Sequence, residues 1–122
     1  MPPAVRAIRG ATTVDFDDKE QVISRVQALM TAILERNELS KDDLISILFT
    51  ATDDIVSMFP ATAARTMGLG DVPLICAREL AVVDGQPLCI RVLLHVHTTR
   101  SRDEMHHVYL HGAQGLRDDL PD

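Results

Sequence analysis

Arginines are the residues best placed for chemistry in this sequence, although its formal net charge is −6. Arg91 interrupts the apolar run at 89–94, where a charge must be paired or face a polar cavity because burying it alone is costly. Glu79 ends another apolar run and is a candidate partner, although a salt bridge that only closes the sheet is an equal alternative. A cavity lined by guanidinium groups in an acidic protein indicates a carboxylate or phosphate ligand.

Other candidate residues are weaker when each is taken alone. Cys76 lies three positions before Glu79, so the two side chains point to opposite faces of a regular strand and meet only if the strand bends. Cys76 is otherwise a small core residue, and a single tyrosine such as Tyr109 is more often a packing residue than a ligand donor. The remaining candidate cations, ordinarily solvated at the surface, are Arg9, Arg65 and Arg117.

The five histidines raise the possibility of a metal site. His95 and His97 share one face of a predicted strand, and a His-x-His pair suits a transition metal. No cysteine pair or carboxylate stands at ligand spacing, so we expect edge histidines and no metal. Phosphate-binding glycine loops and nucleophile-elbow patterns are also missing. The sequence therefore predicts an anion pocket without a nucleophile–base pair and without a cofactor.

Length and composition set the protein class. The 122 residues fit one domain, 1–122, and a hydrophobic content of 46% excludes wholesale disorder. Two cysteines do not form a disulfide framework, the first residues lack a signal-peptide pattern, and no run reaches the roughly 18 apolar residues of a membrane span. The negative charge and scarce aromatics disfavour nucleic acid. We expect a cytoplasmic protein without membrane or nucleic-acid partners.

The apolar spacing predicts a strand, a long helix and a second strand, then a short helix and three more strands. Asp17, with Glu20 three residues later, is the predicted N-cap of the long helix, which ends near Asn37. Pro60 begins the short helix and Gly68 ends it. Asp84 and Gly85 mark a turn, and Ser101 with Glu104 a capped turn. The predicted strands span residues 5–14, 44–50, 72–82, 88–98 and 107–110, and the polar tail 112–122 is expected to be partly mobile.

This order predicts an α+β fold: a mixed sheet of about five strands with one long and one short helix. One long helix cannot cover both faces of such a sheet, so the second face needs water or another subunit. Half of the longest strand is apolar, at Ile90, Val92, Leu94 and Val96. Oligomerisation is therefore expected.

Several separated motifs resemble those of a known family. Residues 6–14 closely resemble the opening of the monofunctional chorismate mutases of the trimeric α+β class, as distinct from the all-helical class. The resemblance extends in register over about residues 5–120. It continues at residues 59–61, at 72–73 with Cys76 and Glu79, and at 89–92, 107–110 and 116–117.

The resemblance implies an enzyme, an isomerase that converts chorismate to prephenate in phenylalanine and tyrosine biosynthesis without a metal or organic cofactor. It also implies a homotrimer whose sheets form a pseudo α/β-barrel, with active sites in clefts between subunits. By the same resemblance, Arg91 faces the substrate's ether oxygen, while Arg9 and Tyr109 hold carboxylate groups. Glu79 and Cys76 correspond to the pair near the ring hydroxyl.

The wall and mouth of the cleft also have counterparts in this sequence. By resemblance, Phe59 corresponds to a wall of the pocket, and Arg65 and Arg117 correspond to basic groups at its mouth. Leu116 corresponds to a tail residue that closes the cleft. Two positions depart from the family pattern: Thr62 replaces a lysine of some members, and Ile75 replaces a threonine. Both changes thin the polar rim, so we expect weaker substrate capture with the chemistry retained.

Two alternatives belong to other functional classes. The enamine/imine deaminases have a similar trimeric α+β fold with an arginine at an intersubunit cleft, but lack the combination of Cys76, Glu79, Arg91 and Tyr109. A non-catalytic, anion-binding trimer would bind carboxylates and form no prephenate. An assay with chorismate separates both from a mutase.

Overall fold

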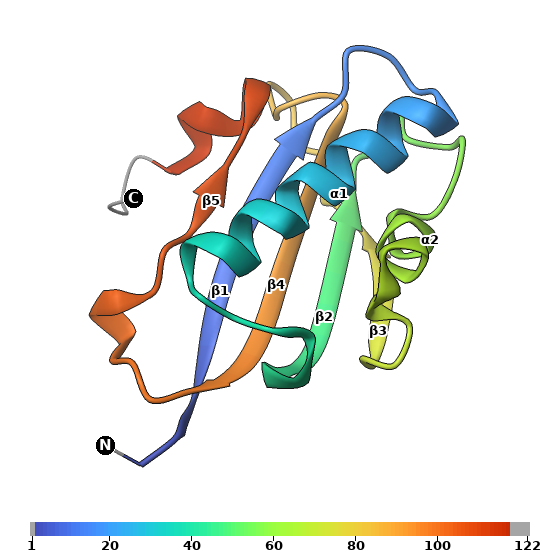
Figure 1. The fold of residues 1–122 in the computed structure, drawn as a ribbon. Coiled ribbons are helices and arrows are strands. Elements are labelled where there is room, and N and C mark those ends of the chain that lie inside the picture. Colours follow the sequence, from blue (N-terminus) through green and yellow to red (C-terminus); the bar gives the residue numbers. More distant parts are fainter. Residues whose placement is uncertain (1, 118–122) are drawn as a thin grey trace.

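The computed structural model describes residues 2–117, which form one five-stranded sheet with two helices on the same face (Figure 1). The strands lie in the order β3-β2-β4-β1-β5. Central β4 is antiparallel to both of its neighbours, whereas β3 is parallel to β2 and β5 is parallel to β1. The predicted mixed α+β sheet is confirmed. The strand bounds are β1 Ala4–Thr13, β2 Leu44–Ala51, β3 Leu74–Arg78, β4 Cys89–Thr98 and β5 Val108–Tyr109.

The core lies between the sheet and helix α1 (Lys19–Arg36), which runs across it (Figure 1). The buried residues of α1 follow helical spacing, as the sequence predicts, and they are Val22, Val26, Leu29, Met30 and Ile33. They share one hydrophobic cluster with alternate residues of β4, namely Ile90, Val92, Leu94 and Val96. Each such side chain contributes roughly 1.5–3 kcal/mol when fully buried, so this contact dominates the fold.

The start of α1 differs from the prediction by one residue. Asp18, not Asp17, is the N-cap, and its carboxylate accepts a hydrogen bond from the Gln21 backbone N–H at 3.2 Å. The carboxylate of Asp17 instead accepts from the backbone N–H groups of Val56 and Ser57, at 2.9 and 3.2 Å. Of the two adjacent aspartates, one therefore caps the helix and the other fastens a distant loop. The predicted end is correct, because Asn37 is the C-cap.

The short helix α2 (Pro60–Ala64) covers the same face beside β3 (Figure 1). Phe59 is its N-cap and Pro60 occupies the first turn, as predicted. The chain continues through a π-type turn, η2 (Arg65–Leu69), in which Gly68 adopts φ +94°. This left-handed conformation favours glycine, so the predicted stop at Gly68 has a conformational basis.

The third predicted strand, 72–82, is too long. In the structure β3 ends at Arg78, and the last ladder-like bond runs from the Glu79 N–H to the Ala51 carbonyl at 3.0 Å. The apolar residues that follow have strand-like composition but leave the sheet. Composition alone could not distinguish a strand from an extended segment without a pairing partner.

Short helical turns complete the chain. They are η1 (Lys41–Asp43), η3 (Arg102–Glu104) and η4 (His111–Arg117). Ser101 and Glu104 form the predicted capping box around η3. Residues 112–117 of the tail lie in η4, and residues 118–122, for which mobility was also predicted, lie outside the described residues. None of the described helices is long and apolar enough to cross a membrane.

Among residues 2–117 no helix covers the opposite face of the sheet, and we call it the open face (Figure 1). The ladder registers place Arg91, Leu93 and His95 of β4 on this face, because its alternate residues are buried beneath α1. Ile75 of β3 is 67% exposed there. A largely uncovered face with apolar members agrees with the expectation that water or another subunit covers it.

Gly10 fixes how closely α1 approaches the sheet. A Cβ atom there would lie 2.9 Å from Ile33 Cδ1 and 3.0 Å from the Val108 carbonyl oxygen. Gly10→Ala should therefore lower the free energy of unfolding by about 1–3 kcal/mol, measured by urea denaturation. Gly70→Ala is the control, because its nearest atom, Arg65 Cγ, is 3.9 Å away and its backbone is helical. Equal stability of the two variants would contradict tight helix–sheet contact at Gly10.

Candidate active site

A shallow pocket of about 200 Å³ lies on the open face where β1, β2, β4 and β5 meet. Arg91 stands opposite Thr50 of β2 and Ala11 of β1, and Ala11 is opposite Tyr109 of β5. Residues paired across a ladder point to the same face, so the register brings these side chains together. The candidate residues that line this open-face pocket are Arg9, Arg91, Tyr109 and Leu116.

Arg91 is paired, as its place in an apolar strand requires. Its Nε lies 3.4 Å from Glu79 Oε1, and the side chains of Arg91 and Glu79 are 43% and 20% exposed. Arg91 Nε is itself buried and makes no hydrogen bond of good geometry with a described residue. The Thr50 hydroxyl donates to Oε2 of Glu79. Thr50 therefore fixes the carboxylate, which in turn holds the guanidinium beside the pocket.

Arg9 and Tyr109 occupy the β1–β5 side of the pocket. The Arg9 side chain is exposed, and its backbone N–H donates to Nδ1 of His107 at 2.9 Å. Tyr109 is buried in a small cluster with Ala11, Cys89 and Ala113, against which Leu116 packs. The last turn of the described chain therefore lies against this side of the pocket.

Cys89 lies beneath the pocket as a neutral group. Burial raises the pKa of its thiol. The nearby Arg91 guanidinium lowers this pKa and the Glu79 carboxylate raises it, but burial has the largest effect. The thiol is therefore protonated at neutral pH and serves as a small packing group. A thiolate nucleophile is not formed here under ordinary conditions.

A second, larger groove of about 830 Å³ lies on the helix side of the sheet, between the N-terminus of α1, the loop at 52–59 and β3. Phe59 and Cys76 line it, together with Thr62. Phe59 is 70% exposed, and Arg65 follows on the neighbouring turn with an exposed side chain. Asp17 holds the loop through its bonds to Val56 and Ser57.

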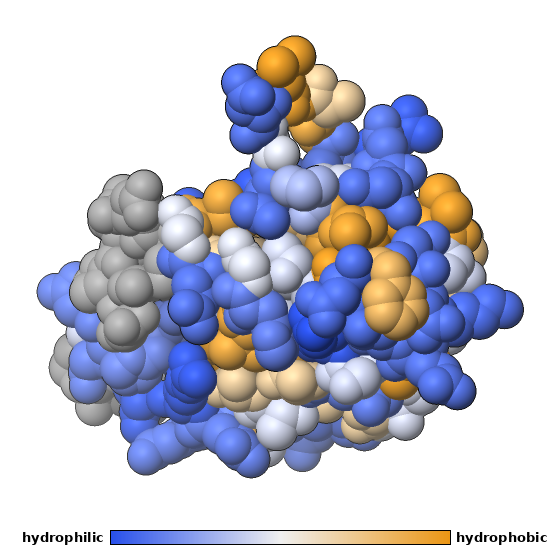
Figure 2. All heavy atoms as spheres, turned by 90° about the horizontal axis from the view of Figure 1, so that it is seen from above, coloured by the Kyte–Doolittle hydropathy of each residue, from blue (hydrophilic) through white to orange (hydrophobic). Residues whose placement is uncertain are grey.

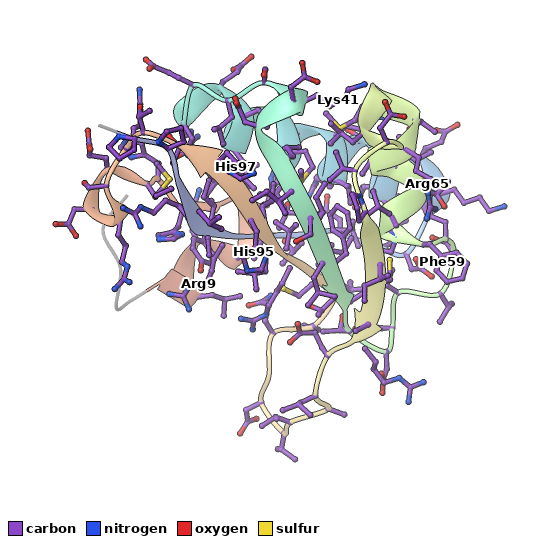
Figure 3. The ribbon with its side chains drawn as sticks, turned by 90° about the horizontal axis from the view of Figure 1, so that it is seen from below. Arg9, Lys41, Phe59, Arg65, His95 and His97 are labelled. Carbon is purple, nitrogen blue, oxygen red and sulfur yellow. The ribbon has the colours of Figure 1, made fainter. Side chains whose placement is uncertain are left out.

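The predicted site residues thus fall into two groups on one chain. Figure 3 shows Phe59 and Arg65 on the β3 side of the molecule and Arg9 well apart from them on the other side. Cys76 and Glu79 face opposite sides of the sheet, as their spacing predicts, so they do not meet within the chain. Arg117 ends η4.

The sequence reasoning missed the residues that orient these groups. Thr50 is a hydroxyl at the end of the apolar strand β2, directly opposite Arg91. Thr52 and Asp54 tie the end of β2 to the start of β4, because the N–H groups of Cys89 and Leu88 donate to them at 3.0 Å each. A polar residue that ends an apolar strand was the available signal for Thr50. The bonds of Asp54 and Asp17 depend on tertiary placement and left no such signal.

The histidines do not gather into a ligand set within the described part of the chain. His95 Nδ1 lies 3.1 Å from the Ser46 hydroxyl on the open face. Across residues 2–117, no group of three or more histidine, cysteine, aspartate or glutamate side chains is placed to hold a metal ion.

Comparisons with known proteins show which family the chain belongs to. The profile of the chorismate mutase type I family matches residues 5–120. Chorismate mutase AroH of Bacillus subtilis (strain 168) is 39% identical over 117 residues, covering 95% of this chain and 92% of that protein. Chorismate mutase AroH of Thermus thermophilus is 44% identical over 117 residues, covering 95% and 96%.

A solved structure agrees at the level of the fold. The chorismate mutase from Clostridium thermocellum superposes with a TM-score of 0.88 at 43% identity, covering 89% of this chain and 97% of that one. These findings give no support to a deaminase-like or a non-catalytic protein. The chain belongs to the type I chorismate mutases, and the protein is an isomerase of that family.

Proposed function

We propose that this chorismate mutase forms prephenate at a cleft shared between two subunits of a homotrimer. The observation that carries the proposal is the division of the candidate residues between the open-face pocket and the groove beside Phe59. Each half is incomplete, because one has the Arg91–Glu79 pair and the other has the apolar wall. A second copy of the chain supplies the missing half of each site.

Symmetry favours a closed ring. The open-face pocket and the Phe59 groove are different surfaces, so a contact between them is heterologous, and heterologous contacts close into rings when the rotation permits. Three subunits, as the family resemblance implies, give three equivalent clefts and cover the open faces. In this arrangement each chain is a single domain that contributes half of each of two clefts. Its two free cysteines suit the reducing cytoplasm, where phenylalanine and tyrosine synthesis would use prephenate.

The chemistry requires enclosure and charge, and no nucleophile. The rearrangement of chorismate is unimolecular, so the cleft must select the compact substrate conformer and stabilise the charge that develops. Negative charge grows on the ether oxygen as the C–O bond breaks, and the Arg91 guanidinium is aimed at it. The Glu79 carboxylate, held by Thr50, stabilises the positive charge left on the ring. Preorganised groups of this kind bind the transition state better than the ground state.

The other residues bind and enclose the substrate. Arg9 and Tyr109 hold carboxylates from the open-face pocket. The groove of the neighbouring subunit contributes the Phe59 wall and, near the ring hydroxyl, the Cys76 thiol. The mouth of the cleft is closed by Arg65, Leu116 and Arg117.

Arg91 is the sharpest test of this mechanism. Arg91→Ala should reduce kcat at least about 10²–10³-fold, because a preorganised donor to a developing oxyanion contributes that much. Arg91→Lys should recover only part, since an ammonium on a flexible stem does not reproduce the planar fork. Arg65→Ala is the matched control and should mainly raise KM. Steady-state kinetics with circular dichroism gives the answer, and a folded Arg91→Ala enzyme with near-normal kcat refutes the assignment.

Thr50 should act as a positioning residue for Glu79. Thr50→Val keeps the shape and strand preference but removes the donor, and a hydrogen bond to a charged group contributes about 1.5–3 kcal/mol. We expect kcat to fall roughly tenfold with KM little changed, and Thr50→Ser to restore most of it. If both variants behave alike, or if only the melting temperature moves, the role is structural.

Subunit mixing tests the shared cleft directly. Arg91→Ala disables the open-face half, and the double variant Phe59→Ala/Arg65→Ala weakens substrate binding by the groove half, so both parents turn over little at chorismate concentrations far below the raised KM. When the two impaired proteins are unfolded and refolded together in equal amounts, about one quarter of the clefts should combine two intact halves. Turnover should therefore return in the mixture and in neither parent. Recovery no greater than the sum of the parents would place the whole site within one chain.

A further inference from the structure

The segment at 79–88, which we call the arm, has no function in the mechanism beyond Glu79. It connects β3 to β4, which are not neighbours in the sheet, because β2 lies between them. Figure 3 shows this segment, coloured from yellow to light orange, projecting beyond the sheet on the face opposite α1. From above, the projection carries apolar atoms at its tip (Figure 2).

The tip of the arm is unusually apolar for an exposed segment. Leu80 and Val83 are each 86% exposed and Val82 is 66% exposed, three of the most exposed large hydrophobic residues in the described chain. Among the described residues, the backbone bonds of 80–85 stay within the arm, from Val82 N–H to the Leu80 carbonyl and from Gly85 N–H to the Val82 carbonyl. A tip that is largely uncovered by the described residues is a candidate contact surface.

The base of the arm is firmly held. Glu79 N–H bonds the Ala51 carbonyl, and Leu88 N–H bonds the Asp54 carboxylate, each at 3.0 Å. Asp84 and Leu88 adopt positive φ values of 69° and 49°, which residues other than glycine rarely do. The arm therefore has a defined direction, away from its own sheet.

The groove beside Phe59 has the matching chemistry. Its apolar lining includes Ile23, Ile55, Val56, Met58, Phe59 and Ala77. Val56 is 80% exposed, so the groove, like the arm, is left largely uncovered by the part of the chain that the structure describes. Lys19, Asp53 and Arg78 also line it, and Arg78 Nε lies 3.1 Å from Asp53 Oδ1. Beyond Glu79, the charge of the arm is Asp84. Apolar surface is therefore present on both sides, with the Lys19 ammonium on the groove and the Asp84 carboxylate on the arm.

The arm and the groove of one chain point in different directions. The arm leaves the open face, whereas the groove lies on the helix side beside β3. In the proposed shared cleft, however, the groove of a neighbouring subunit faces the pocket that holds Arg91 and Glu79. An arm that begins at Glu79 and projects from that same face would then run along the neighbour's groove.

We propose that the arm of each subunit clasps the next copy of this chain by packing Leu80, Val82 and Val83 against the groove around Val56 and Phe59. This inference rests on the proposed intersubunit cleft. The arm then seals one side of the cleft from water, and assembly of the ring completes the substrate site.

The test replaces the tip without disturbing the fold. Leu80 and Val83 are each 86% exposed in the single chain, so Leu80→Ser/Val83→Ser removes little packing within it. Burial of each side chain in an interface changes affinity roughly tenfold or more, so the protein concentration at which the trimer dissociates should rise at least that much. Phe16→Ser, at another exposed apolar residue outside the arm and groove, is the control and should change nothing.

The readouts are light scattering and chorismate turnover over the same dilution series. In the arm variant, turnover should fall on dilution together with the trimer and return at high protein concentration. Unchanged assembly and turnover overturn the arm contact while leaving the shared cleft intact. If turnover is lost while the trimer is unchanged, the arm acts on the site without stabilising the interface, and this result also overturns the proposed contact. A wild-type monomer that turns over chorismate refutes the proposed shared cleft itself.

Crosslinking locates the contact even if the serine variant folds poorly. Cys76 lines the groove, whereas Cys89 is buried. Val83→Cys, treated with a short bismaleimide, should therefore yield covalent dimers and trimers in a denaturing gel. The same treatment of Val83→Cys/Cys76→Ala and of the wild type should leave monomers. Monomers alone from Val83→Cys, in a preparation that is trimeric by light scattering, place the arm away from the groove.

Discussion

The burial of one face of β4 beneath α1 is the constraint on which the rest of the structure depends. Because side chains alternate along a strand, sending Ile90, Val92 and Leu94 into the core sends Arg91 to the other face. A slip of one residue would bury a guanidinium under α1, which is costly enough to fix the register. The close approach of Ile33 to Gly10 fixes how near α1 lies to the sheet. The open-face pocket is thus a consequence of how the core packs.

The Arg91–Glu79 pair contributes little to stability, and its role in the proposed mechanism is to bind the substrate. Arg91 is nearly half exposed and its Nε lies 3.4 Å from the carboxylate, and solvent-screened pairs of this kind contribute little to folding. The protein is acidic overall, with a net charge of −6, so its long-range field repels an anionic substrate. Capture must therefore come from local cations at the pocket. A carboxylate fixed by Thr50 keeps one of them in place without neutralising the whole guanidinium surface.

The sequence predicted what depends on local patterns and missed what depends on tertiary contacts. The order of the elements along the chain, the end of α1 and the pairing of Arg91 with Glu79 follow from periodicity and from the cost of an unpaired charge. The choice between Asp17 and Asp18 does not, since the two residues are identical and only the loop at 56–57 distinguishes them. Residues 80–83 have strand composition but meet no partner strand, so β3 ends early. The separation of Phe59 from Arg91 follows from topology, which no short window contains.

That separation suits the reaction this family catalyses. A unimolecular rearrangement needs no sequence of proton transfers along one rigid chain, only a dry, charged enclosure of fixed shape. Two surfaces brought together by assembly provide such an enclosure, and water leaves as the interface forms. The proposed shared cleft would also couple activity to association, because a site that exists only between subunits is populated only when they are bound. In such an enzyme, interface residues that touch no substrate determine the activity at low protein concentration, because they determine how much trimer is present. Residues that contact the ether oxygen determine the rate of the reaction in each assembled cleft.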